Sequence, residues 1–246
     1  MLLDVRRLAE LIQELARELT AGTPPPRGLP YLGLEHTSGT GSHLLDALST
    51  HGIFRKYESV VELGAGLGGS ARCLAARLGC EVVAVNTTAA EAEAAGMLNR
   101  RTGVRLQVRF AAAHLGALPF RPARFTHVWI VETLEAAADP DAVLAEAFRV
   151  VRPGGHLAVQ QLVGPERGEG VCAEAIAAAG FVEVDVRDVT ADAGERSPRV
   201  AAAREHLLER ASAHPELAAT VRERRAVADA IGAGHLRVIQ LFARRP

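Results

Sequence analysis

A glycine-rich turn between an apolar run and a helical run constrains this chain more than any other feature. Residues 59–63 read Ser-Val-Val-Glu-Leu, residues 64–69 read Gly-Ala-Gly-Leu-Gly-Gly, and residues 70–78 continue as Ser-Ala-Arg-Cys-Leu-Ala-Ala-Arg-Leu. Glycine is needed where φ is positive or where a ligand lies against the backbone, and the amides that begin a helix attract polar or anionic groups. The stretch therefore predicts a strand, a tight turn and a helix, with a binding site at the carboxyl end of the strand.

The spacing of the glycines narrows the choice of ligand. Gly64, Gly66 and Gly69 fit the pattern G-x-G-x-x-G, which alone does not separate dinucleotide-binding from S-adenosylmethionine-binding sheets. Glu62 stands two residues before the first glycine, Gly68 adds a further glycine, and no second fingerprint follows. With the downstream segments described next, the stretch resembles motif I of the class I S-adenosylmethionine-dependent methyltransferases. The branch it resembles acts on small molecules and includes sterol, tocopherol, sarcosine and ubiquinone-type enzymes.

Three downstream segments carry the resemblance. Asn-Thr-Thr at 86–88 follows an apolar run over 81–85, and Leu-Pro-Phe at 118–120 follows a predicted third strand over 105–110. Arg-Pro-Gly-Gly at 152–155 follows a helical pattern over 139–151, and we expect Pro153 to stop that helix. The resemblance spans about residues 31–163 and the closing strand over 235–244. It implies an α/β fold: a Rossmann-like, doubly wound, seven-stranded sheet with an antiparallel last strand.

Helical periodicity extends this core at both ends. Apolar residues recur at helical spacing over 2–19 and 43–51, and again over 200–213 and 215–231, between the last two strands. We predict four segments: N-terminal helices and a covering loop (1–52), an S-adenosylmethionine-binding core (53–190), a helical cap (191–233) and the final core strand (234–246). The helix over 2–19 either packs on the body of the domain or serves as a lid or dimer contact.

The resemblance implies a set of cofactor-binding residues, and two of them depart from the usual pattern. Asn86 stands where most relatives carry an acid that takes both ribose hydroxyls; an amide can still accept one hydrogen bond and donate another. His114 stands where the family has an acid that receives the adenine amino group, while Leu115 can still offer its backbone amide. The full predicted set is Gly39, Glu62, Gly64, Ala65, Gly66, Gly68, Asn86, Thr87, His114, Leu115 and Val131.

Two side chains are candidates for catalysis. His36 lies in a His-x-x-Gly segment that resembles the one preceding motif I in many small-molecule methyltransferases, and a near-neutral imidazole can act as a general base; a solvated loop histidine is the alternative. Glu132 follows the fourth strand, where a carboxylate can orient an acceptor, take a proton or offset the sulfonium charge. We predict substrate contacts at Tyr31, Gln161 and His206.

Composition limits the partners and the compartment. The 246 residues are 48% hydrophobic, enough for one substantial core, and the formal net charge of -1 with 4% aromatic residues disfavours nucleic acid or a membrane surface as partner. The three cysteines are scattered, and the histidines lack metal-ligand spacing, so we expect neither a disulfide framework nor a bound metal. The start of the chain has no signal-peptide pattern, and arginine and alanine dominate in the manner of genome composition bias, so we expect a bacterial, cytoplasmic protein.

These observations predict transfer of a methyl group from S-adenosylmethionine to carbon, nitrogen or oxygen of a small molecule by in-line displacement, producing S-adenosylhomocysteine. One alternative is a non-catalytic or repurposed methyltransferase fold that binds the cofactor or a metabolite, because two acids of the family are missing. The other is a nicotinamide-linked oxidoreductase, which is disfavoured because Lys56, the only lysine, cannot complete a Tyr-x-x-x-Lys pattern.

Overall fold

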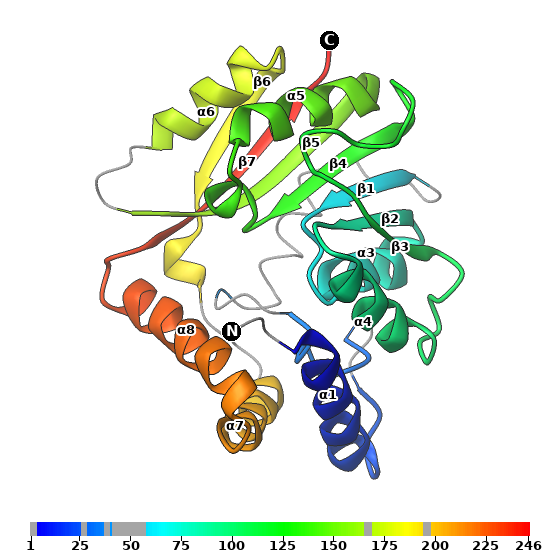
Figure 1. The fold of residues 1–246 in the computed structure, drawn as a ribbon. Coiled ribbons are helices and arrows are strands. Elements are labelled where there is room, and N and C mark those ends of the chain that lie inside the picture. Colours follow the sequence, from blue (N-terminus) through cyan, green and yellow to red (C-terminus); the bar gives the residue numbers. More distant parts are fainter. Residues whose placement is uncertain (1–3, 26–28, 37–39, 41–57, 165–168, 194–197) are drawn as a thin grey trace.

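A seven-stranded mixed sheet forms the centre of the computed structural model, which describes residues 4–25, 29–36, 40, 58–164, 169–193 and 198–246 (Figure 1). The strand order is β3-β2-β1-β4-β5-β7-β6. β1 to β5 pair in parallel, and β7 runs antiparallel between β5 and β6. The predicted fold class is therefore confirmed. The strands are β1 (Ser59–Leu63), β2 (Glu81–Asn86), β3 (Val108–Ala112), β4 (Phe125–Val131), β5 (Val151–Val163), β6 (Val182–Asp188) and β7 (Arg237–Arg244).

Helices cover both faces of the sheet and extend beyond it. In Figure 1, α5 and α6 lie above the sheet. The helices α1, α7 and α8 lie below it in the same view. The predicted helix over 43–51 lies outside the described residues. The helices are α1 (Val5–Thr20), α3 (Gly69–Leu78), α4 (Ala89–Asn99), α5 (Pro140–Val150), α6 (Glu169–Ala178), α7 (Pro198–Ser212) and α8 (Pro215–Gly232), with short 3-10 turns at η1 (Leu134–Ala136) and η2 (Thr190–Asp192).

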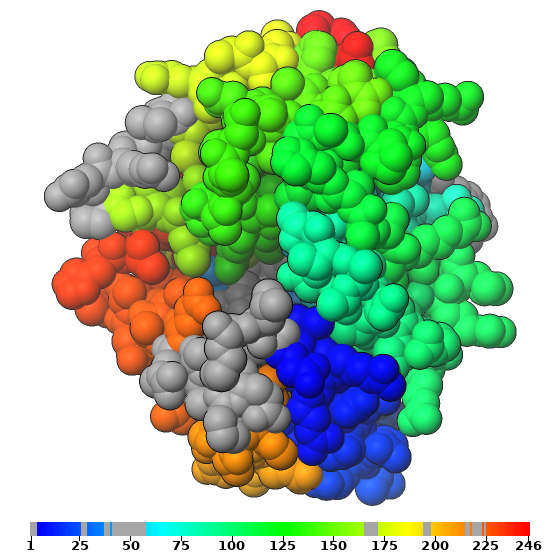
Figure 2. Space-filling view, in the orientation of Figure 1, coloured from blue at the N-terminus to red at the C-terminus, as the bar shows by residue number. Residues whose placement is uncertain are grey.

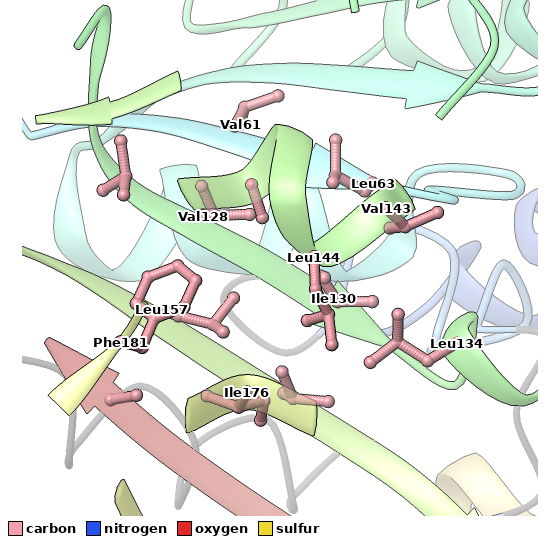
Figure 3. Packing of buried hydrophobic residues seen from close by; sticks show 14 of the residues in the cluster. Val61, Leu63, Val128, Ile130, Leu134, Val143, Leu144, Leu157, Ile176 and Phe181 are labelled. Atoms are coloured by element: carbon pink, nitrogen blue, oxygen red, sulfur yellow. The ribbon is translucent and has the colours of Figure 1, made fainter. Parts of the chain in front are cut away.

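The two faces of the sheet are both buried, as continuous apolar strands require. Val61 and Leu63 belong to the hydrophobic cluster that also contains Leu144 of α5 and Ile176 of α6 (Figure 3). Val60, one residue out of step, belongs to the opposite cluster around α3. This packing fixes the carboxyl ends of β1, β2 and β4 relative to one another.

The N-terminal helix packs within the chain. Its buried residues recur at helical spacing, and its amino end is capped by Asp4, whose side chain accepts a hydrogen bond from the backbone of Arg7. The apolar face joins one cluster with residues of α4 and α7, and Figure 2 shows the blue N-terminal residues seated beside the green α4 region. A dimer contact through α1 would therefore have to use its charged face. The buried residues are Leu8, Ala9, Leu11, Ile12, Leu15 and Ala16.

The start of the third strand is predicted wrongly, and the joint after α5 differs in detail from the prediction. The third strand begins at Val108 instead of residue 105, because residues 101–107 form turns in which Gln107 donates its amide to Val104. α5 ends at Val150, before Pro153, and β5 runs through the Pro-Gly-Gly joint. The guanidinium of Arg245 donates to the carbonyls of Phe148 and Arg149, so a side chain that follows β7 also caps this helix.

Among the described residues, no helix is both long enough and apolar enough to cross a membrane.

Candidate active site

The glycine turn after β1 is built as the sequence predicts. Gly64 and Gly68 have φ values of 77° and 78°, in the left-handed region that favours glycine. The amide of Gly64 donates to the carbonyl of Val85 at 2.8 Å, which ties the turn to the end of β2. A side chain at position 64 would collide with Thr133, so the turn also lies against the exit of β4.

A cavity of about 230 Å³ opens at this point, at the carboxyl ends of β1, β2 and β4. Five residues predicted to bind cofactor and one predicted to be catalytic line it together. The other four lining residues, Glu91, Thr133, Ala136 and Ala137, are not predicted from the sequence, because none belongs to a motif of the resemblance. The lining residues are Gly64, Gly66, Asn86, Thr87, Glu91, Leu115, Glu132, Thr133, Ala136 and Ala137.

Asn86 lines this cavity and carries a buried side-chain oxygen. Its Nδ2 donates to the carbonyl of Gly66 at 2.7 Å, which fixes the orientation of the amide. Its Oδ1 is buried and has no hydrogen-bond partner among the residues that the structure describes. A buried acceptor without a donor is costly, so this atom suits a ligand hydroxyl. Asn86, which stands where the resemblance implies an acid, thus retains Oδ1 as a hydrogen-bond acceptor. Its Nδ2 already donates to the backbone of the glycine turn.

Glu91 brings a carboxylate back to the same cavity. It is the third residue of α4 and forms a capping box with Thr88. The backbone amide and hydroxyl of Thr88 and the hydroxyl of Thr87 donate to its Oε2, at 3.2, 2.9 and 3.2 Å. These three donors hold Oε2 and so fix the orientation of the carboxylate. The pattern Thr-x-x-Glu after the second strand was a signal for this helix start that could have pointed to Glu91.

Glu62 lies beneath the turn and is not among the residues that line the cavity. It is 2% exposed and accepts a hydrogen bond from the hydroxyl of Ser70 in α3. Burial raises the pKa of the Glu62 carboxyl to about 7, although the Ser70 hydrogen bond and the charge of Arg72 oppose that shift. Its cofactor contact stays a prediction, and its visible contact joins β1 to α3.

His36 packs against the start of α3. A side chain at Gly69 would come within 2.8 Å of its Nδ1. Burial lowers the pKa of the His36 imidazole to about 3, and the charges of Arg204, Arg72 and Arg77 add to the effect. Such an imidazole is neutral at physiological pH and a weak base, because a general base works best with a pKa near the operating pH.

The other predicted residues divide between the site and its surroundings. Tyr31 is buried, and its hydroxyl donates to the carbonyl of Leu98, so it anchors the N-terminal segment on α4. Gln161 is buried in β5 on the opposite face from Gln160. His114 is exposed, with its Nδ1 accepting from the amide of Gly116, and His206 is exposed on α7. Gly39 lies outside the described residues. Ala65 and Val131 adjoin lining residues in the chain, and Gly68 lies two residues beyond Gly66.

Comparison with known proteins agrees with this geometry. Residues 61–159 match a family described as a methyltransferase domain. Over 97 residues the chain is 38% identical to sarcosine/dimethylglycine N-methyltransferase of Halorhodospira halochloris, covering 39% of this chain and 35% of the relative. Over 105 residues it is 30% identical to the chloroplastic tocopherol O-methyltransferase of Arabidopsis thaliana, covering 43% and 30%. The chain thus matches about a third of the length of these relatives.

A crystal structure described as the [4+2]-cyclase SpnF shares the fold with a TM-score of 0.69 at 20% identity, covering 98% of this chain and 95% of that one. The fold is a Rossmann-like α/β architecture with the glycine turn at the carboxyl end of β1. Residues 61–159 match the methyltransferase-domain family, and the two relatives above are named as an N-methyltransferase and an O-methyltransferase.

Proposed function

We propose that the protein binds S-adenosylmethionine in the cavity beside the glycine turn and transfers its methyl group to carbon, nitrogen or oxygen of a small molecule. The observation that carries the proposal is the convergence of the turn, the buried Asn86 Oδ1 and the Glu132 carboxylate on one cavity in a methyltransferase domain. The cofactor, when bound, supplies an activated methyl group on a positively charged sulfur. The chain's task is to hold, orient and shield the reactants.

Each lining group suits one part of the cofactor. The Oδ1 of Asn86 would accept a ribose hydroxyl, and the carboxylate of Glu91 would accept a second hydrogen bond from the same region. The glycine turn leaves the backbone open to the ligand, and the Leu115 side chain offers an apolar surface. Two carboxylates and an amide oxygen therefore meet a ligand that is rich in hydroxyl and amino donors.

Catalysis by this chain would rest chiefly on positioning. Holding two reactants in an aligned geometry supplies about 7 to 11 kcal/mol of barrier lowering in favourable cases. Where the acceptor must lose a proton, Glu132 is the better placed of the two candidate bases, because it lines the cavity and the pKa of His36 is lowered to about 3. A positioned base contributes about 10²- to 10⁴-fold. Tyr31, Gln161 and His206 stay candidates for acceptor contacts.

The proposal extends to the setting of the enzyme. A net charge of -1 and 4% aromatic residues support a small-molecule acceptor over nucleic acid or a membrane surface. Arginine and alanine bias supports a bacterial source, and we place the activity in the cytoplasm. A homodimer, if formed, would use the charged face of α1.

The test is transfer of a labelled methyl group. The purified protein is incubated with methyl-labelled S-adenosylmethionine and a panel of amine, phenol, sterol-like and polyketide-like acceptors, and S-adenosylhomocysteine is quantified. We expect label in at least one acceptor class, and loss of transfer in Gly66→Asp, which fills the turn with a side chain. Binding of the cofactor without transfer to any acceptor would instead support the repurposed fold.

A further inference from the structure

Polar side chains from three separate parts of the chain form a hydrogen-bonded network with Glu132. Gln240 of β7 donates its Nε2 to the Oε1 of Gln160 in β5 at 2.9 Å. The Nε2 of Gln160 lies 2.9 Å from Oε1 of Glu132 and 3.1 Å from the hydroxyl of Thr40. That hydroxyl lies 2.5 Å from the same Glu132 oxygen. The side chains thus form one continuous network that ends on a cavity-lining carboxylate.

The network has a defined direction. Because the Gln240 amide nitrogen donates to the Gln160 oxygen, the Gln160 NH₂ group must face Thr40 and Glu132. Thr40 accepts from Gln160, so its single hydroxyl proton is directed to Glu132. Both donors therefore converge on Oε1 of Glu132, which acts as an acceptor. Both donors are uncharged, so they orient the carboxylate without cancelling its charge.

Burying the polar side chains of this network costs free energy. Gln160, Gln240 and Thr40 are 1%, 0% and 0% exposed, and the two glutamines stand opposite each other in the centre of the β5–β7 ladder. Buried amides cost free energy unless they are paired, and apolar residues fill such positions without that cost. A merely structural role in the sheet does not require glutamine here.

The backbone of Glu132 gives a second, independent observation. Its φ is 50°, in the left-handed region that few residues other than glycine adopt. Its amide donates to the carbonyl of Gln160 at 2.7 Å, so β5 holds the strained residue in place through main chain as well as side chain. Strain of this kind persists where the surroundings fix it and often marks a functional position.

We propose that Gln240, Gln160 and Thr40 are positioning residues that hold the charged carboxylate of Glu132 toward the cationic sulfur of the cofactor. The inference rests on the proposed function, because it needs S-adenosylmethionine in this cavity. It assigns to Glu132 selectivity for the charged cofactor over the uncharged thioether of S-adenosylhomocysteine. Gln240 acts only through Gln160 and touches neither ligand.

The matched pair of ligands allows a test that needs no acceptor. Calorimetric dissociation constants for S-adenosylmethionine and S-adenosylhomocysteine are measured for the wild type and for Glu132→Gln, Gln240→Met and Thr40→Val. The double variant Glu132→Gln/Gln240→Met completes a cycle. Gln13→Met, which removes a glutamine bonded to the Met97 carbonyl away from the network, is the control. Thermal melts verify that each variant is folded. If Gln240→Met does not fold, Thr40→Val replaces it as the test of the network.

We expect Glu132→Gln to weaken S-adenosylmethionine relative to S-adenosylhomocysteine by about tenfold, because only the sulfonium of S-adenosylmethionine loses its attraction to the carboxylate charge. Gln240→Met and Thr40→Val shift the ratio in the same direction by about threefold, and Gln240→Met adds nothing once Glu132 is glutamine. Equal weakening of both ligands, or an undiminished Gln240→Met effect in the Glu132→Gln background, overturns the positioning role. Failure of the wild type to bind either ligand instead overturns the proposed function itself.

Discussion

Replacing the buried acid beneath the turn should stabilise the protein in a pH-dependent way. Glu62 is 2% exposed, and burial raises the pKa of its carboxyl from 4.5 to about 7. An acid whose pKa is higher in the folded than in the unfolded state binds its proton more tightly when folded. Its contribution is therefore most favourable at low pH, and stability is lost as pH rises from the unfolded value near 4.5 through the folded value near 7.

The magnitude follows from the same shift. At about 1.4 kcal/mol per pKa unit, the difference between 4.5 and about 7 corresponds to about 3 kcal/mol of lost stability at pH 8. Glu62→Gln keeps the size of the side chain and its capacity to bond Ser70, but it cannot ionise. We expect the variant to exceed the wild type by about this amount at pH 8 and to differ little below pH 4.

Urea unfolding at a series of pH values between 4 and 8 measures this difference directly. Glu81→Gln, at an exposed position on the neighbouring strand, is the matched control and should track the wild type. A Glu62→Gln variant that is less stable than the wild type at pH 8, or one whose curve runs parallel to it at every pH, would refute the reasoning.

Three further predictions follow from single contacts. Gly64→Ala places a Cβ against Thr133 at a φ of 77°. We expect it to lower the free energy of unfolding by about 1–3 kcal/mol and to abolish cofactor binding. Gly96→Ala, in open space on α4, is the control and should do neither. Glu91→Gln should weaken S-adenosylmethionine about tenfold in a calorimetric titration, because the cavity loses a charged acceptor; affinity equal to that of Glu93→Gln would contradict this. Arg245→Ala removes the donor to three carbonyls at the end of α5. It should lower the urea midpoint of unfolding by an amount that corresponds to about 1–3 kcal/mol. An unchanged midpoint would contradict this.

The part of the fold that local pattern determines could be predicted from sequence. The turn at 64–69 requires positive φ, which only glycine adopts freely. The glycines in the sequence therefore predict where the strand ends and the helix begins. The strands around it are continuous apolar runs because both faces of the sheet are covered. Asn86 ends β2, and Leu115 and Glu132 come after β3 and β4, so they could be placed at the site because the carboxyl ends of parallel strands meet at one edge of the sheet.

The rest depends on contacts between distant residues. Thr40 and Glu132 lie 92 positions apart, and Gln160 and Gln240 lie 80 apart, so no local pattern indicates their network. His36 resembles a catalytic histidine in sequence, yet its packing against the start of α3 decides its charge. The start of β3 differs from the predicted residue because a turn at 104–107 replaces the first residues of the expected strand.

The most direct test of the central claim is an equilibrium titration of the whole chain with S-adenosylmethionine, followed by competition with S-adenosylhomocysteine. We expect micromolar binding of one molecule per chain, competition between the two ligands, and loss of both in Gly66→Asp. Absence of binding by a folded wild-type protein, or binding that Gly66→Asp leaves unchanged, would contradict the assignment of the cofactor to the cavity beside the glycine turn.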